Sequence, residues 1–242
     1  MDPRDWLIYE DRAVLAFAKP AGLAAQGGTG VTQSLDAMLA GLSRNPRTVP
    51  RLVHRLDRDT SGIILAGRTR TATAALSAAF ASRTVAKTYY AIVCGGAPEP
   101  PAGMIDRAIV RTRHNGVDIV RVGDAGEGGA QPAQTEYETC AASTAAALVR
   151  AKPHTGRMHQ IRLHLASLGR PIAGDGKYGG LFALEGRAIP SMMLHAGALE
   201  APHPEGGRLR LVAAAPPAFR ETAAALGLFG PDLETTTWER LP

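Results

Sequence analysis

The chain contains few of the residues that build extracellular or membrane-spanning proteins. Only two of its 242 residues are cysteines, Cys94 and Cys140, too few for a disulfide framework or, by themselves, for a zinc site. No run of about 18 apolar residues is present, the length that indicates a membrane-spanning helix. The N-terminal segment MDPRDWLIYEDR is acidic and polar, unlike a signal peptide. These absences predict a cytoplasmic protein.

Lysine is also scarce, so arginine supplies most of the positive charge. Lysine occurs only at positions 19, 87, 152 and 177, among 27 basic residues in all. The net charge of +5 favours an anionic partner, although weakly. Arginine binds phosphate as a planar fork and stacks on bases, which suits RNA. A codon-usage bias would leave the same excess, so composition alone does not decide the partner.

The pattern of apolar residues predicts an α+β fold with a mixed, mainly antiparallel sheet flanked by helices and loops. Strands and helices follow one another without regular β-α-β alternation, which argues against a purely parallel sheet. Helical spacing predicts helices over 32–42, from 69 onward, over 159–169 and near the C-terminus. Apolar and β-branched runs predict strands over 13–18, 62–67, 88–94 and 146–152, with short strands in 104–140.

The segment HRLDRDTSG, residues 54–62, concentrates charge immediately before the apolar run IILAG. A carboxylate beside a strand that enters the core is costly unless it is paired. Asp59, Thr60 and Ser61 are typical of a turn in which side chains bond the backbone. Asp57 is either one member of a structural ion pair or a functional carboxylate, and the segment alone leaves both readings open.

A second polar segment, PHTGRMHQIRLHLASLGRPIAGDGKYGG, covers residues 153–180. His159 and Arg162 are three residues apart in the predicted helix and share a face. Ile161, Leu165 and Leu168 form the other face. Arg162 can therefore reach a polar pocket from the buried side, and a bidentate pair with Arg162 would keep Asp57 ionised.

A third segment, KTYYAIVCGG, covers residues 87–96. Side chains alternate across a strand, so Tyr89 and Tyr90 are predicted on opposite faces. One of them should face the core and the other solvent or a cleft. Packing alone is the commoner role for a strand tyrosine.

Taken together, these three segments closely resemble the pseudouridine synthases of the RluA/RsuA superfamily, and the RluA branch in particular. EDRAVLAFAKPAG resembles the opening strand and turn of that family, and LHAGALEAPHP resembles its closing segment. The resemblance runs from about residue 8 to about residue 220. It implies a single catalytic domain over 1–242 with a central RNA-binding cleft, and no N-terminal RNA-binding extension.

The resemblance also assigns roles to residues. It implies that Asp57 is the catalytic aspartate, that Tyr89 is the active-site tyrosine and that Arg162 pairs with Asp57. Arg55 would fill the place of the displaced base. The residues expected to contact RNA are Arg55, His54, Lys87, Arg157, His159, Gln160 and Arg170. His154 stands where the family usually has arginine, which puts one phosphate contact in doubt.

The implied reaction is isomerisation of a uridine within RNA. The target nucleotide must be flipped out of its stack, at a cost of a few kcal/mol. Asp57 would then add to the sugar or assist loss of a neighbouring hydrogen, and the sequence does not separate these routes. No cofactor or metal is expected: His159 and His164 are five apart with no acid between them, unlike a zinc-binding helix.

Two other classes of function stay open at this stage. A catalytically silent RNA-binding protein with the same fold would need no buried carboxylate, and a nucleoside or glycoside hydrolase would release free uracil. The expected partner is rRNA or tRNA, with no DNA and no membrane, and the chain is expected to be a monomer.

Overall fold

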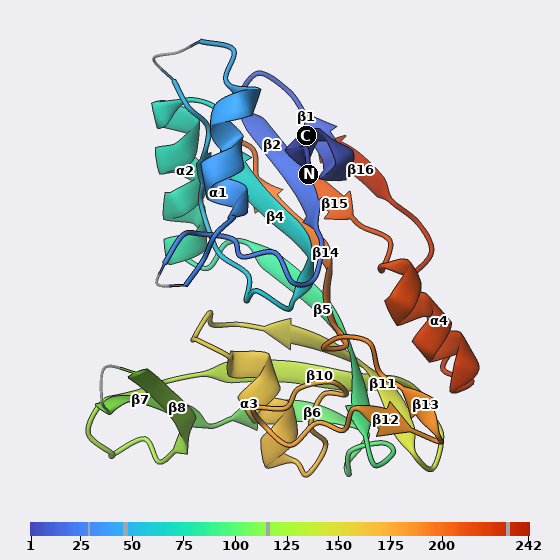
Figure 1. The fold of residues 1–242 in the computed structure, drawn as a ribbon. Helices are drawn as coiled ribbons and strands as arrows, with labels where there is room; N and C mark the ends of the chain where they lie inside the picture. Colours follow the sequence, from blue (N-terminus) through green and yellow to red (C-terminus); the bar gives the residue numbers. More distant parts are fainter. Residues whose placement is uncertain (29, 46–47, 115–116, 231–232) are drawn as a thin grey trace. The chain divides into compact units, whose positions relative to one another are not determined.

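A computed structural model describes residues 1–28, 30–45, 48–114, 117–230 and 233–242 of the chain. The Cα positions separate into two compact units (Figure 1). Unit 1 comprises residues 1–87, 195–216 and 232–242, and unit 2 comprises residues 88–194 and 217–231. Each unit is described by itself.

Unit 1 is a mixed sheet with short helices. Its strands β1, β2, β4 and β14 are neighbours in that order, β3 pairs with β4, and β15 pairs with both β14 and β16. The β4–β14 pair is parallel, whereas the β1–β2, β2–β4 and β14–β15 pairs are antiparallel. The elements are η1 (Pro3–Trp6), β1 (Leu7–Glu10), β2 (Val14–Lys19), α1 (Leu35–Met38), η2 (Leu39–Leu42), β3 (Arg51–Leu52), β4 (Ser61–Gly67), α2 (Arg70–Ala81), β14 (Leu194–Pro202), β15 (Arg208–Val212) and β16 (Thr237–Leu241).

Helix α2 covers one face of this sheet beside β4 (Figure 1). Thr69 caps the helix by accepting a hydrogen bond from the Ala72 amide at 3.1 Å, as its place before the apolar stripe predicts. Leu76 is buried in a core with Ile63 and Leu65 of β4. Alternate strand residues and one helix stripe therefore meet, and their burial supplies most of the stabilisation here.

The helix predicted over residues 32–42 is wrong in extent. It is only one α-helical turn, α1, followed by the 3₁₀ turn η2. Leu35 and Asp36 donate their amides to the carbonyls of Ala24 and Ala25, which ties the start of α1 to these two residues. Ser34 is the N-cap, because its hydroxyl accepts from the Ala37 amide.

Unit 2 contains an antiparallel sheet in the order β5, β11, β10 and β6, and a three-stranded sheet in the order β8, β7 and β9. Helix α3 packs against the smaller sheet, where Leu163 is buried with Ile109, Val120 and Ala133. The elements are β5 (Ala86–Cys94), β6 (Ala102–Asp106), β7 (Ala108–His114), β8 (Val117–Gly123), β9 (Ala130–Gln131), β10 (Gln134–Ala142), β11 (Ala146–Pro153), α3 (Gln160–Ser167), β12 (Ala183–Leu184), β13 (Arg187–Ala188) and α4 (Pro217–Ala225).

The structure confirms the predicted fold class. Both units combine helices with sheets in which antiparallel pairs predominate, and β4 with β14 makes the arrangement mixed. Within the described ranges, no helix has both the length and the apolar character needed to span a bilayer.

Candidate functional site

Asp57 lies in unit 1, on the loop that connects β3 to β4. The Thr60 amide donates to the Asp57 carbonyl at 3.1 Å and closes a turn over residues 57–60. Leu56 is buried, Asp57 is half-buried, and Arg55 points into solvent. The loop therefore anchors an apolar residue in the core and presents its charged neighbours near the surface.

Lys19 supports this loop from the buried side. Its side chain is 1% exposed, and its ammonium group donates to the carbonyls of Pro20 at 2.8 Å, Leu23 at 2.8 Å and Arg58 at 3.0 Å. Burial lowers the pKa of Lys19 to about 8, although the charges of Asp59 and Asp57 act in the opposite direction. One buried cation thus joins the end of β2 to the main chain next to Asp57.

A second contact joins the turn after β2 to the same loop. The Gly22 amide donates to the Arg58 carbonyl at 3.0 Å, and the Arg58 Nε donates to the Gly22 carbonyl at 3.0 Å. Lys19 and Gly22 belong to the segment KPAG, which sequence reasoning treated as a turn only. These contacts explain why a lysine ends β2 and a glycine lies in the turn that follows.

His54 was predicted to contact RNA, but its ring is occupied by the protein. Its Nε2 accepts a hydrogen bond from the Leu65 amide at 3.0 Å, and its ring stacks on Phe80 with 4.3 Å between centroids. Burial lowers the pKa of His54 to about 3, so at neutral pH it carries no charge for a phosphate. This geometry favours a structural role at the start of the Asp57 loop.

The other end of the loop is fixed by Ser61 and His195, which are opposite each other in the parallel β4–β14 pair. The His195 Nε2 lies 3.0 Å from the Ala213 carbonyl, which can only accept, so Nδ1 accepts from the Ser61 hydroxyl at 2.9 Å. Burial lowers the pKa of His195 to about 4, which keeps the ring neutral.

Gly62 explains why a glycine follows this serine. Its φ angle is +111°, and a Cβ at this position would lie 2.2 Å from the Ala196 carbonyl oxygen. Only glycine therefore lets β4 and β14 approach this closely where the Asp57 loop enters the sheet.

In unit 2, β5 presents Tyr89 and Tyr90 on opposite faces, as predicted. Tyr90 is 2% exposed and belongs to the core, whereas Tyr89 is half-buried. Tyr89 is thus the tyrosine with an accessible part, consistent with the role that the family resemblance implies for it.

Arg162 lies on α3, and its structural partner in unit 2 is Asp175. The Arg162 Nε donates to one carboxylate oxygen at 2.7 Å and Nη2 donates to the other at 2.8 Å. Such a two-bond fork is the strongest arrangement for an arginine and a carboxylate. The pair of Arg162 with Asp57 stays a prediction, and Asp175 is a residue that sequence reasoning missed.

His159 and Arg162 both contact Tyr178, but the predicted helix over 159–169 is wrong in extent, because α3 begins at Gln160 and His159 is its N-cap. The Arg162 Cζ lies 4.9 Å from the Tyr178 ring centroid, and the His159 Nδ1 lies 2.6 Å from the Tyr178 hydroxyl. His159 has a φ angle of +55°, which is uncommon outside glycine. The segment GDGKYGG carried the signal for this cluster, because it brings an acid and a tyrosine three residues apart.

Gln160, another predicted RNA contact, is buried in a polar network. Its carboxamide oxygen accepts from the Thr155 hydroxyl at 2.6 Å and the Arg157 amide at 3.0 Å. Its Nε2 donates to the Thr135 hydroxyl at 2.9 Å. This network fixes the HTGR turn to β10, which favours a structural role for Gln160.

The same network includes His164. Its Nε2 lies 3.0 Å from the Arg107 carbonyl and its Nδ1 lies 2.8 Å from the Thr135 hydroxyl. Burial lowers the pKa of His164.

Of the remaining predicted RNA contacts, Arg157 and Arg170 are half-buried and bind main-chain carbonyls. The Arg157 Nε donates to Pro132 at 3.2 Å, and the Arg170 Nε donates to Ala97 at 2.8 Å. Lys87 is half-buried at the start of β5, where burial and then Arg83 lower its pKa. These positions leave their contacts with RNA as predictions.

A possible metal-binding cluster in the described residues consists of Asp11, His203 and Glu205. The His203 Nδ1 accepts from the Glu205 amide at 3.2 Å, and Nε2 lies 2.9 Å from Asp11 Oδ2. Asp11 also accepts from the Tyr9 hydroxyl and from the amides of Ala13 and Val14. Both histidine nitrogens are therefore engaged within the protein in this structure.

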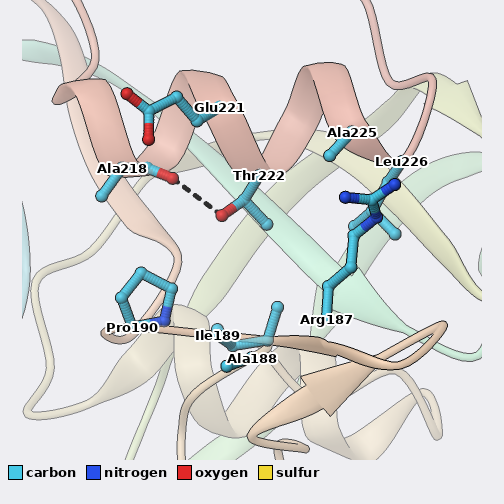
Figure 2. Close-up of a pocket in the computed structure, with 9 residues that line it drawn as sticks. All are labelled: Arg187, Ala188, Ile189, Pro190, Ala218, Glu221, Thr222, Ala225 and Leu226. Atoms are coloured by element: carbon cyan, nitrogen blue, oxygen red, sulfur yellow. Dashed lines mark hydrogen bonds between the residues drawn. The ribbon is translucent and has the colours of Figure 1, made fainter.

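A pocket of about 210 Å³ lies in unit 2 between α4 and residues 187–190 (Figure 2). Figure 2 shows the Thr222 hydroxyl turned to the Ala218 carbonyl of its own helix, at 2.7 Å. The lining residues are Arg187, Ala188, Ile189, Pro190, Ala218, Glu221, Thr222, Ala225 and Leu226. None of them is a predicted site residue.

The chain is an α+β protein, and comparison with known proteins gives its class. The family model for RNA pseudouridylate synthase matches residues 13–167, a range that contains Asp57, Tyr89 and Arg162. The chain therefore belongs to the RNA pseudouridylate synthase family.

Curated relatives carry the name ribosomal large subunit pseudouridine synthase C. The Vibrio cholerae protein is 39% identical over 72% of this chain and 52% of its own length. The Escherichia coli K12 protein is 34% identical over 87% of this chain and 66% of its own length, and the Pasteurella multocida protein is 35% identical over 91% and 67%. The chain thus spans about half to two thirds of these relatives.

Solved structures agree with this family. Human RNA Pseudouridylate Synthase Domain Containing 4 is 27% identical, with a TM-score of 0.77 and 95% of each chain covered. Human RNA Pseudouridylate Synthase Domain Containing 1 has a TM-score of 0.70 over 98% of this chain and 89% of its own, and at 24% identity it shares the fold.

Proposed function

We propose that this chain is an RNA pseudouridine synthase that isomerises uridine in ribosomal large subunit RNA without a cofactor. The observation that carries the proposal is the family match over residues 13–167, which contains the whole HRLDRDTSG segment together with Tyr89 and Arg162. The names of the curated relatives favour rRNA over tRNA as the substrate. A tRNA stem-loop is the alternative target.

In this proposal the units act as one catalytic domain on an everted nucleotide. Asp57 supplies the carboxylate that attacks or deprotonates the sugar, and Tyr89 contacts the base. Arg162 stabilises the charge on Asp57. Arg55 is exposed and has the flat guanidinium that fills the gap left by the base. The ordered Asp57 loop supports this, because a reactive group must be held in place before substrate arrives.

The test uses two carboxylates in the same loop. Purified chain is incubated with large-subunit rRNA, small-subunit rRNA and tRNA, and pseudouridine is mapped in each. Asp57→Asn should lower the rate by more than about 10³-fold. Asp59→Asn is the matched control, because Asp59 is exposed, two residues away, and should retain activity.

The outcomes separate the alternatives. Near wild-type activity of Asp57→Asn would reject the proposed catalytic role. Binding of RNA without any pseudouridine would indicate the silent RNA-binding protein, and release of free uracil would indicate a hydrolase. Modification confined to tRNA would replace the substrate class and leave the reaction unchanged.

We further infer a cytoplasmic monomer. Cys94 and Cys140 are both free thiols, as expected in a reducing compartment. Light scattering of the purified chain, with and without RNA, measures its oligomeric state.

A further inference from the structure

The loop that follows α3 is closed by main-chain hydrogen bonds and carries two side chains, those of Asp175 and Tyr178. The Asp175 amide donates to the Ile172 carbonyl at 3.1 Å, and the Tyr178 and Gly180 amides donate to the Asp175 carbonyl at 3.2 and 2.8 Å. A Cβ on Gly174 would lie 2.2 Å from the Ser191 carbonyl oxygen, so only glycine allows this chain path. The backbone that carries Asp175 and Tyr178 is therefore tightly constrained.

These two side chains meet Arg162 of α3 and His159, the N-cap residue that precedes it. Asp175 takes the Nε and Nη2 donors of Arg162, and the Tyr178 ring lies near the same guanidinium. The Tyr178 hydroxyl is in turn bonded to His159. Asp175 and Tyr178 are three residues apart in sequence, and so are His159 and Arg162. The loop and the N-terminal end of α3 therefore meet in two contacts.

The ion pair between Arg162 and Asp175 is buried, and its geometry fixes the direction of the guanidinium. The Asp175 side chain is 2% exposed and the Arg162 side chain 11%. A carboxylate this deeply buried is costly unless a cation and hydrogen bonds compensate it. The guanidinium is planar with fixed donor directions, so the two bonds to Asp175 set the direction of its opposite edge.

Charge in this cluster stays positive despite Asp175. Arg162 and Asp175 cancel each other, and the Lys177 ammonium lies 5.7 Å from the Tyr178 ring centroid. The Lys177 amide also donates to Asp175 Oδ1 at 3.2 Å. The cluster can thus orient Arg162 and still favour binding of an anionic group beside it.

We propose that Asp175 is a positioning residue for the reaction, and that it acts by fixing the guanidinium of Arg162 with help from Tyr178. The inference rests on the proposed function and deepens it. Asp175 touches no reacting atom in this scheme, because it acts only through the Nε–Nη2 edge of Arg162.

A double-mutant cycle tests the proposal. Single-turnover rates and RNA affinities are measured for wild type, Asp175→Asn, Arg162→Lys and the double variant, since lysine cannot form a two-bond fork. Asp175→Asn should lower the rate about 10- to 100-fold and change RNA affinity less than about 3-fold. The double variant should be no slower than Arg162→Lys, because coupled residues are not additive.

The control is Glu138→Gln, which removes the carboxylate partner of Arg150 on the β10–β11 pair of the same unit. Its rate should match wild type. Independent, multiplicative losses in the Asp175 and Arg162 variants, or a wild-type rate for Asp175→Asn, would overturn the proposal.

Tyr178 keeps the test decisive if Asp175→Asn does not fold. Tyr178→Leu should lower the rate further than Tyr178→Phe, which keeps the aromatic face, and the loss should disappear in an Arg162→Lys background. Equal losses in the two Tyr178 variants, or a loss that persists in that background, would contradict positioning. Loss of the Asp57 requirement would instead reject the proposed function, so the two failures are distinguishable.

Discussion

The two units hold their candidate residues by different means. In unit 1 the Asp57 loop is fixed at residues that flank Asp57: Lys19 donates to the Arg58 main-chain carbonyl, and the His54 ring accepts from an amide of β4. In unit 2 Arg162 is fixed through its own side chain, by Asp175 and Tyr178. Contacts at flanking residues order a loop, whereas contacts made by the functional side chain orient that one group.

Lys19→Met should have the largest effect on this contrast. It leaves the carbonyls of Pro20, Leu23 and Arg58 without their buried donor, and we expect a loss of roughly 3 kcal/mol in the free energy of unfolding. Lys19→Arg should fail to rescue, because a planar fork does not match three convergent carbonyls. Urea unfolding measures both, with Lys152→Met, an exposed lysine paired to Glu136, as the control.

The same variant makes a pH prediction. The pKa of Lys19 is about 8 in the folded chain and about 10.4 when unfolded. The unfolded chain therefore binds more protons between these values, and the stability of wild type gains from this group as pH rises from 8 to 10.4. The stability gap to Lys19→Met should widen over that range, and a constant gap would contradict a buried ammonium.

His195 should give the next largest effect, at acid pH. Its pKa is about 4 in the folded chain and about 6.5 when unfolded. Its stabilisation is complete above pH 6.5 and is lost as pH falls towards 4, by about 2 kcal/mol between pH 7 and 5. His195→Gln removes the titrating ring, so the difference from wild type should shrink on acidification and stay constant between pH 7 and 8. Denaturant titrations at these pH values would show an unchanged difference if the ring is not buried in solution.

The smallest effect is expected where unit 2 has an ion pair on its surface. The Glu138 side chain is 52% exposed, so Glu138→Gln should change the free energy of unfolding by less than about 1 kcal/mol. Asp175→Asn, whose side chain is buried, should cost several times more. Equal costs in thermal unfolding would show that burial does not distinguish the two arginine pairs.

Local patterns in the sequence predicted much of this protein. Alternation across β5 separates Tyr89 from Tyr90, because it depends only on backbone geometry. The mixed, antiparallel-rich fold class followed from the order of elements. The helix from residue 69 onward was predicted too, and α2 begins at Arg70 behind its cap Thr69.

Contacts between distant segments escaped prediction. The amides of Leu35 and Asp36, in the first turn of α1, are bonded to the carbonyls of Ala24 and Ala25. Gln160 and His54 are residue types that often occur in binding sites. In the structure, however, they form hydrogen bonds inside the protein. Burial of this kind is not visible in residue type alone.

The sequence by itself determined the class of protein and its candidate chemistry, because long motifs such as HRLDRDTSG name both residues and order. Only the tertiary structure decided that Lys19 supports the Asp57 loop and that Asp175 takes one edge of Arg162. The physical reason is that a buried charge must be compensated by whichever donors or acceptors the fold brings near it, and those partners lie 39 and 13 residues away along the chain.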